Sequence, residues 1–277
     1  MSLDLIPTSA ENKKKMWGTV IWLLIWVIGS LLVIGSLVYT LGVSWDKLTN
    51  AKTIENFMQI IGEMLPPDFS VVATLGKPII ETIAMSVVAT LLAVFLSFPL
   101  SFLAARNTTI NPTVQFAVRG LFNALRSIPE LIMGVIFVAA VGFGILPGVL
   151  ALGIHSIGML GKFYAEAIEK VDFGLMEAIQ STGGSRFHVI VFSIIPQILS
   201  HCVDYSLYRW EYNFRASSVV GLIGAGGVGF QLIASLRIMQ YQEVSAILLV
   251  VYVLVQLVDG FGNMIRRRLL EGKEVNI

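Results

Sequence analysis

The chain has 277 residues, of which 56% are hydrophobic and only 13% are charged, and its mean hydropathy is +0.80. Soluble domains carry about a quarter charged residues, so this composition excludes an ordinary soluble protein and predicts a membrane protein. The formal net charge is +1, and the charged residues gather at the ends of apolar runs, where a bilayer protein needs them. One cysteine, Cys202, and three histidines without paired spacing predict neither an intrachain disulfide nor a metal site.

The first apolar run extends from Met16 to Trp45 and follows Lys13, Lys14 and Lys15. It is longer than the roughly 20 residues that cross about 30 Å of hydrocarbon. A signal peptide has a shorter apolar core and ends in a small-residue cleavage site, which is absent here. We therefore expect an uncleaved first span with its N-terminus in the cytoplasm.

The second apolar run is Thr82 to Ala105. The segment before it, Ser44 to Lys77, carries charges of both signs and should lie outside, and Pro66-Pro67 should end any helix there. Three arginines follow the run and should lie in the cytoplasm: Arg106, Arg119 and Arg126.

The next uncharged stretch, Leu131 to Gly161, is too long for one comfortable span. Glycines and a proline between Gly142 and Gly148 predict a turn, which gives two spans at about 127–145 and about 149–168. Pro129 should produce a kink or occupy an N-terminal position of its helix. The chain then returns to the cytoplasm at Lys170 and Asp172.

The segment from Glu177 to Pro196 reads EAIQSTGGSRFHVIVFSIIP, a polar, glycine-broken stretch between apolar runs. A helix with Glu177 and Ala178 should break at Gly183-Gly184, and Ser185 is a good N-cap for a second short helix. Taken alone, the segment could be an ordinary cytoplasmic hairpin between two spans.

A fifth span should begin near Pro196, and a sixth should run from near Val244 to the arginines 266–268. The fifth span contains four charged residues, namely Asp204, Arg209, Glu211 and Arg215. Each costs roughly 2.5–3.5 kcal/mol at a helix centre, which demands a partner or a function. The candidates for the substrate path are Arg209, Glu211 and Arg215. Glu211 and Arg215 are four residues apart and can instead form a structural pair, whereas an unmatched Arg209 would suit contact with an anion. His155 and His201 are expected to be interhelical polar residues.

Between these spans lies the glycine-rich segment GLIGAGGVG. Its flexible, helix-poor sequence does not suit a lipid-facing element, so it should line a cavity or pack against protein. It is a candidate gate, with simple close packing as the alternative; the glycines concerned are Gly221, Gly224, Gly226, Gly227 and Gly229. Its match to the dinucleotide fingerprint lacks the required strand context, and no phosphate-binding P-loop occurs in the sequence.

The segment 177–196 closely resembles the EAA loop of ABC importer permeases, with small departures at Ile179 and Gly184. The resemblance implies a cytoplasmic coupling loop, about 171–195, that inserts into a groove of a partner ATPase. The residues implied in coupling are Glu177, Ala178, Gly183, Gly184, Ser185 and Pro196.

Three further stretches resemble the phosphonate-uptake permeases, a branch of the type I importers: 122–142, 150–172 and 206–230. This resemblance implies two ATPase subunits, a second permease (another copy or a relative) and an external substrate-binding protein. It implies phosphonate, phosphite or a related phosphorus oxyanion as substrate. The chain itself would bind no cofactor, and ATP and magnesium would be used by the ATPase.

We thus expect an all-α, polytopic permease of about six spans, without enzymatic activity. It should lie in the bacterial inner membrane with both termini in the cytoplasm. Membrane lipid is an expected partner, and nucleic acid is not. Residues 1–78 would hold the first span and external segment, and residues 79–277 the permease core. Alternatives are an importer permease for another small solute and a self-sufficient secondary transporter, although repeated halves are not visible. An intramembrane enzyme lacks a nucleophile with a facing base, since His201 and Cys202 are neighbours on one helix.

Overall fold

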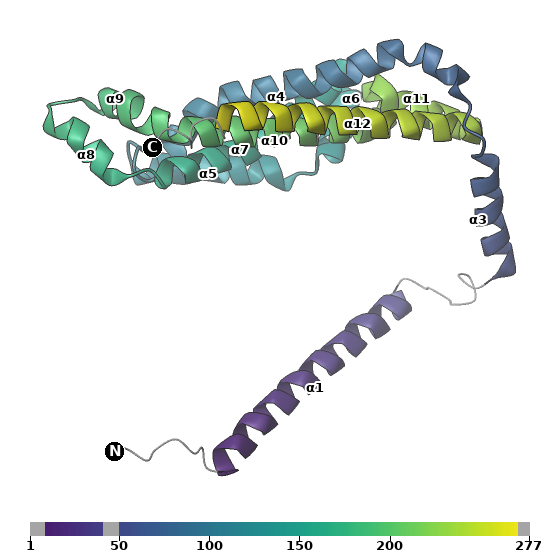
Figure 1. The fold of residues 1–277 in the computed structure, drawn as a ribbon, viewed down its shortest axis with the longest axis horizontal. Coiled ribbons are helices and arrows are strands. Elements are labelled where there is room, and N and C mark those ends of the chain that lie inside the picture. Colours follow the sequence, from purple (N-terminus) through teal and green to yellow (C-terminus); the bar gives the residue numbers. More distant parts are fainter. Residues whose placement is uncertain (1–8, 41–49, 271–277) are drawn as a thin grey trace. The chain divides into compact units, whose positions relative to one another are not determined.

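The computed structural model describes residues 9–40 and 50–270 (Figure 1). The chain divides into two compact units, Met1–Gly62 and Glu63–Ile277. The first contains α1 (Ser9–Thr40), in which Trp17–Ser36 is long and apolar enough to cross a membrane. The predicted end of this span at Trp45, and the beginning of the external segment (44–49), lie outside the described residues.

A second helix, α3 (Ala51–Glu63), follows in the predicted external segment and was not expected from the sequence. It ends before Pro66-Pro67, as the two prolines predict. The expected start of the permease core at residue 79 stays a prediction, and the second compact unit begins earlier, at Glu63.

The second unit consists of helices and turns, with no strand among the residues that the structure describes. A 3-10 turn (Phe69–Thr74), capped by the Asp68 carboxylate, leads into the first long helix. The α-helices that follow are α4 (Gly76–Ala104), α5 (Pro112–Ser127), α6 (Glu130–Val141), α7 (Ile145–Glu169), α8 (Phe173–Ser181), α9 (Arg186–Val189), α10 (Ile195–Val220), α11 (Gly227–Arg237) and α12 (Tyr241–Leu270). Two short π-helical segments, Ile190–Ile194 and Gly221–Ala225, flank α10.

Helices α4 and α7 form the centre of the bundle and pack along most of their lengths. The buried face of α4 carries small residues, including Ala89 and Ala93. On α7, a Cβ added to Gly153 would lie 2.9 Å from the side chain of Leu92. Small residues let membrane helices approach closely where the hydrophobic effect gives no driving force, so this pair is held by close contact.

The third predicted span is wrong in its bounds. Residues 112–141 form two helices, α5 and α6, that meet at an angle of 84°. The break falls at Ile128-Pro129, because a residue before proline avoids helical backbone angles, and Pro129 caps α6 as its position predicts. Arg119 and Arg126 therefore lie on the helix α5, and their location on the cytoplasmic side stays a prediction.

Among the described residues, five helical segments are long and apolar enough to span a membrane, or six if the bent pair α5–α6 counts as one. The predicted turn occurs at Gly142–Gly144, and the last two spans begin close to the predicted residues. The segment 221–229 is less helix-poor than expected, because Gly227 begins α11. The chain is thus an all-α, multi-pass membrane protein.

Candidate functional site

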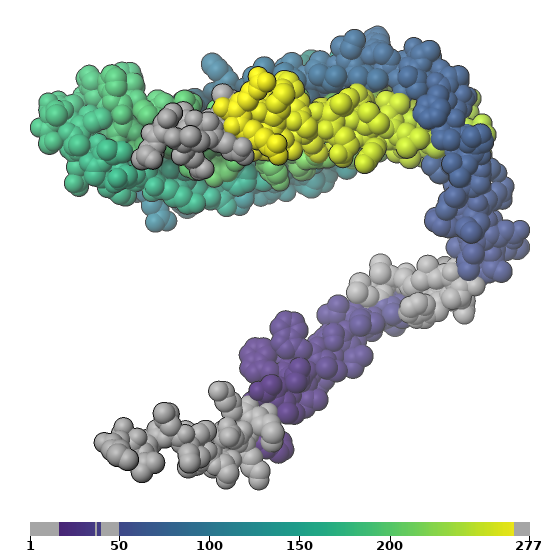
Figure 2. All heavy atoms as spheres, in the orientation of Figure 1, coloured from purple at the N-terminus to yellow at the C-terminus, as the bar shows by residue number. Residues whose placement is uncertain are grey.

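The predicted docking loop is an elbow at one end of the second unit, beyond the ends of α4 and α12 (Figures 1 and 2). Asp172 caps the N-terminus of α8, and its carboxylate accepts a hydrogen bond of 2.8 Å from the Gly174 backbone N–H. Met176 is buried and anchors the helix, whereas Glu177 and Ala178 are exposed. The two residues that the motif emphasises are therefore free to contact another protein.

The glycine pair ends α8 for two different reasons. Gly183 has a φ of +82°, which side chains other than glycine rarely adopt. At Gly184 the backbone N–H donates to the carbonyl oxygen of Ile179 over 3.1 Å, and a Cβ would lie 2.7 Å from that oxygen. One glycine supplies the backbone angle and the other allows the close approach, as the sequence predicted for a helix break.

The far arm of the elbow is α9, which begins after Ser185 as expected. The Ser185 hydroxyl bonds Nδ1 of His188 at 2.7 Å in place of a backbone cap. The rings of Phe187, His188 and Phe192 lie against one another, and the two phenylalanines are 70% and 65% exposed. Exposed aromatic side chains at a protruding tip are typical of a protein contact surface.

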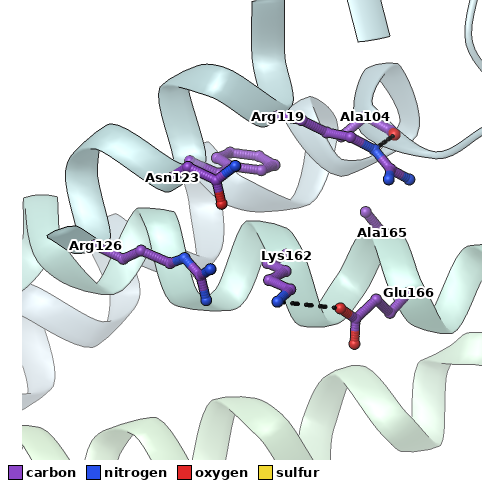
Figure 3. A pocket seen from close by; sticks show the side chains of 8 residues that line it. Ala104, Arg119, Asn123, Arg126, Lys162, Ala165 and Glu166 are labelled. Carbon is purple, nitrogen blue, oxygen red and sulfur yellow. Dashed lines mark hydrogen bonds and ion pairs between the residues drawn. The ribbon is translucent and has the colours of Figure 1, made fainter. Parts of the chain in front are cut away.

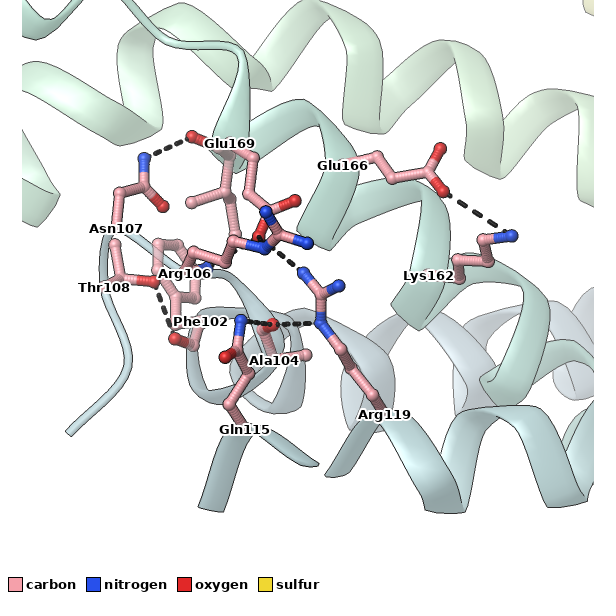
Figure 4. Close-up of polar contacts among 11 residues, drawn as sticks. Phe102, Ala104, Arg106, Asn107, Thr108, Gln115, Arg119, Lys162, Glu166 and Glu169 are labelled. Carbon is pink, nitrogen blue, oxygen red and sulfur yellow. Dashed lines mark hydrogen bonds and ion pairs between the residues drawn. The ribbon is translucent and has the colours of Figure 1, made fainter. Parts of the chain in front are cut away.

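A set of hydrogen bonds joins the ends of α4, α5 and α7 beside the elbow (Figure 4). Arg119 donates from Nε to the Ala104 carbonyl at 2.8 Å and forms an ion pair with Glu169. The backbone N–H of Arg106 donates to the same carboxylate at 2.7 Å, and Asn107 donates to the carbonyl of Ile168 at 2.6 Å. These hydrogen bonds join the C-terminal end of α4 to that of α7, so a displacement of one helix end would displace the other. Sequence spacing gave no sign of this role for Glu169, because its partners lie 50 or more residues away.

The glycine-rich segment lies at the opposite end of α10, packed against protein. Gly224, Gly226 and Gly227 all have positive φ values, between +71° and +102°. The freed backbone groups find partners: the Gly227 N–H donates to Oε2 of Glu81 at 3.0 Å, and the Gly224 carbonyl accepts from the Gly144 N–H at 3.1 Å. The segment therefore joins α4 and the α6–α7 turn to α10. A role as a gate stays a prediction.

Arg209 occupies the middle of the bundle and is only 3% exposed. Its Nε donates to the Ser156 hydroxyl at 2.7 Å, and its guanidinium carbon lies 4.3 Å from the centre of the Tyr212 ring. The Tyr212 hydroxyl donates to Oε1 of Glu130 at 2.7 Å, and Nδ1 of His155 lies 3.5 Å from the other oxygen of that carboxylate.

This network is not complete. One terminal nitrogen of Arg209 is buried without a hydrogen-bond partner, as is Nδ1 of His155. Unpaired buried donors are costly and mark a place where a water or a polar ligand would be favoured. The sequence singled out Arg209 and His155 but not Glu130, which lies on α6, or Tyr212, which lies on α10 beside Arg209.

The other two charged candidates of α10 form ion pairs with α12. Nη1 of Arg215 donates to both carboxylate oxygens of Asp259, at 2.8 and 2.9 Å, and Glu211 lies 3.4 Å from Arg266. These contacts replace the Glu211–Arg215 pair that the spacing suggested, because both side chains point toward α12 and not along their own helix. A contact with substrate stays a prediction for all three charged candidates of α10.

A multi-pass helical bundle that exposes a glycine-broken elbow at one end has the architecture of a transporter subunit. The chain belongs to the family "Binding-protein-dependent transport system inner membrane component", whose model matches residues 97–271. Its fold is that of the type I ABC importer permeases. The chain is a permease subunit and not an enzyme.

Curated relatives and solved structures agree with this family. The chain is 53% identical over 222 residues to the phosphite transport system permease protein PtxC of Stutzerimonas stutzeri, covering 80% of this chain and 81% of that one. It is 41% identical to the phosphate-import permease protein PhnE of Mycolicibacterium smegmatis, covering 80% of this chain and 42% of the relative. The inward-facing MetNI methionine ABC transporter has the same fold, with a TM-score of 0.64 at 21% identity over 73% of this chain and 98% of that one.

Proposed function

We propose that the chain is the membrane-spanning subunit of an ATP-driven importer for phosphite, phosphonate or a related phosphorus oxyanion. The observation that carries the proposal is the 53% identity to a phosphite permease over 80% of the chain. A buried arginine with an unpaired donor in the bundle supports it, because a guanidinium can hydrogen-bond two oxygens of such an anion.

The proposed assembly contains two ATPase subunits, a second permease and an external binding protein that delivers the anion. ATP and magnesium are bound by the ATPase, and this chain binds no cofactor. Closure of the ATPases moves the elbow around Glu177 and Gly183, and the hydrogen-bonded ends of α4 and α7 carry the motion into the bundle. The aromatic tip at Phe187 and Phe192 is the surface that the ATPase would cover.

The test is uptake into proteoliposomes that contain the permease with its ATPase. We expect accumulation of labelled phosphite or methylphosphonate only when both ATP and the loaded binding protein are present. Uptake of another small solute in place of the oxyanion would correct the substrate class. Uptake that needs an ion gradient and no ATP would favour a secondary transporter.

The proposed location is the bacterial inner membrane with both termini in the cytoplasm, which places the elbow inside. In a Cys202→Ala background, we expect Gly76→Cys to react with a membrane-impermeant maleimide from outside and Ser181→Cys only after permeabilisation. Both positions are exposed, and a Cβ at Gly76 meets no atom within 4 Å. The labelling is done without the ATPase, which would cover the elbow. Labelling of Ser181→Cys in intact cells would contradict the proposed orientation.

A further inference from the structure

A cavity of about 270 Å³ opens between α5 and α7 on the half of the bundle that leads to the elbow (Figure 3). Arg119, Asn123 and Arg126 line it from α5, and Lys162 and Glu166 line it from α7. On each helix these residues are three or four apart, so each set shares one helix face. The cavity thus has three cationic side chains and one carboxylate in its wall.

The three basic side chains of the cavity differ in whether a carboxylate or carbonyl group of the protein pairs with them. Arg119 is occupied by the Ala104 carbonyl and Glu169, and Lys162 lies 3.6 Å from Glu166. The side chain of Arg126 forms no hydrogen bond or ion pair with any described residue. Excess positive charge therefore remains at the end of the cavity where Arg126 lies.

Arg126 lies beside the middle of a membrane-spanning helix, where an unpaired positive charge needs an explanation. Helix α5 packs closely on α7, since a Cβ at Gly158 would lie 2.6 Å from the Phe122 carbonyl and 2.9 Å from the Arg126 backbone nitrogen. Gly158 is near the midpoint of α7 (Ile145–Glu169), which is a membrane-spanning helix. An ionised side chain at mid-span without a partner marks a path for ions or a polar ligand, because such a charge is otherwise costly.

We propose that this cavity is a phosphorus-oxyanion site, in which Arg126 and Lys162 bind the anion on the side of the bundle nearer the elbow. The proposal rests on the proposed function for the substrate class. The planar guanidinium of Arg126 can hydrogen-bond two oxygens, and Lys162 supplies a point charge across the cavity. Glu166 competes for Lys162 and keeps the binding weak, as release into the cytoplasm requires. Arg119 is a positioning residue that holds the wall.

Two sources could supply such an anion: the transported oxyanion and the phosphate of an anionic lipid headgroup. Both have the same tetrahedral oxygens, so the side chains alone do not distinguish them. The experiment therefore separates the two sources.

The test introduces Asn123→Cys, at the cavity wall, into a Cys202→Ala permease in complex with its ATPase, in phosphatidylcholine nanodiscs. We compare its reaction rates with negatively and positively charged thiosulfonate reagents of similar size. An anion site should favour the negative reagent about tenfold or more, since a cleft lined by one charge concentrates the opposite charge. Added Arg126→Gln should remove this preference, whereas the matched charge removal Arg268→Gln, in the last turn of α12, should leave it unchanged.

Phosphite or inorganic phosphate should slow the reaction of the negative reagent if the transported anion occupies the site. Slowing by phosphatidylglycerol in the nanodisc, without an effect of phosphite, would assign the site to a lipid headgroup. An equal rate for both reagents, or a preference that survives Arg126→Gln, would overturn the proposal.

Transport gives an independent measurement. In proteoliposomes, the double variant Arg126→Gln, Lys162→Gln should take up phosphite about tenfold more slowly while loaded binding protein still stimulates ATP hydrolysis. Wild-type uptake in the double variant would contradict a site on the substrate path. If the unmodified transporter takes up no phosphorus oxyanion, the proposed function fails, and the reagent preference still reports whether the cavity selects anions.

Discussion

Replacing Gly183 with valine is expected to reduce stimulated ATP hydrolysis and uptake strongly while leaving membrane insertion intact. Gly183 has a φ of +82°, and a Cβ there would meet no atom within 4 Å, so the substitution acts through the backbone alone. A left-handed conformation costs a residue with a side chain about 1–2 kcal/mol, and a β-branched residue tolerates it least. The elbow should therefore relax to another shape and lose its fit to the ATPase.

The size of the effect follows from the free energy that couples the two subunits. Couplings of 1–3 kcal/mol correspond to roughly 5- to 150-fold changes in affinity, so binding-protein-stimulated hydrolysis should fall by at least about fivefold. Gly183→Ala should give a smaller loss, because alanine tolerates the left-handed region better than valine. Gly76→Val is the matched control, since Gly76 is equally open to solvent but has an ordinary backbone angle.

The measurements are co-purification of the ATPase with the permease, hydrolysis with loaded binding protein, and uptake. Loss of co-purification would place the defect in docking, and retained docking with lost stimulation would place it in transmission. Normal stimulated hydrolysis together with normal uptake in Gly183→Val would refute a coupling role for this glycine.

The sequence predicted the helix break in the elbow and most spans correctly, because each depends on residues that are close together in the sequence. The apolar runs gave α4, α7, α10 and α12, and the break between α8 and α9 follows from glycines that only their own neighbours constrain. The break at Pro129 was predicted, but α5 as a separate helix before it was not, because α5 is amphipathic, carries Arg119 and Arg126, and lacks the long apolar run of a span. Helix α3 was missed for the same reason, being short and polar on one side.

The polar contacts inside the bundle were beyond the reach of sequence spacing. Tyr212 and Glu130 are 82 residues apart, and Arg215 and Asp259 are 44 apart. The spacing of Glu211 and Arg215, four residues apart on one helix, predicts that they pair with each other. In the bundle both side chains instead pair with residues of the neighbouring helix α12. The cost of a charge in a span could be predicted, but its partner depends on the packing of other helices.

Arg209→Lys is expected to reduce uptake about tenfold or more while assembly and basal ATP hydrolysis persist. The guanidinium of Arg209 donates to Ser156 from one nitrogen, covers the ring of Tyr212 and leaves another nitrogen unpaired. Lysine keeps the charge but has one nitrogen on a flexible stem, so it cannot reproduce the planar contact and the free donor together. If the free donor contacts the anion during passage, the lysine variant loses transport selectively.

Arg215→Lys provides the matched control, because it makes the same chemical change on the same helix. Arg215 is more exposed and is engaged by both oxygens of Asp259. A lysine keeps the positive charge and can keep that ion pair, so we expect uptake within about twofold of the unmodified transporter.

The ratio of anion transported to ATP hydrolysed separates a substrate contact from a structural role. A substrate contact predicts a lower ratio for Arg209→Lys with an unchanged thermal unfolding midpoint, since the fold retains its buried charge beside Glu130. A structural role predicts that the unfolding midpoint and hydrolysis fall together. If both lysine variants transport at the unmodified rate, and Arg209→Ala fails only through poor assembly, the arginines of α10 are structural. The anion would then have to pass by other cations. Arg126 is at a similar depth to Arg209, because Arg209 bonds Ser156 and the backbone of Arg126 lies against Gly158, two residues further along α7.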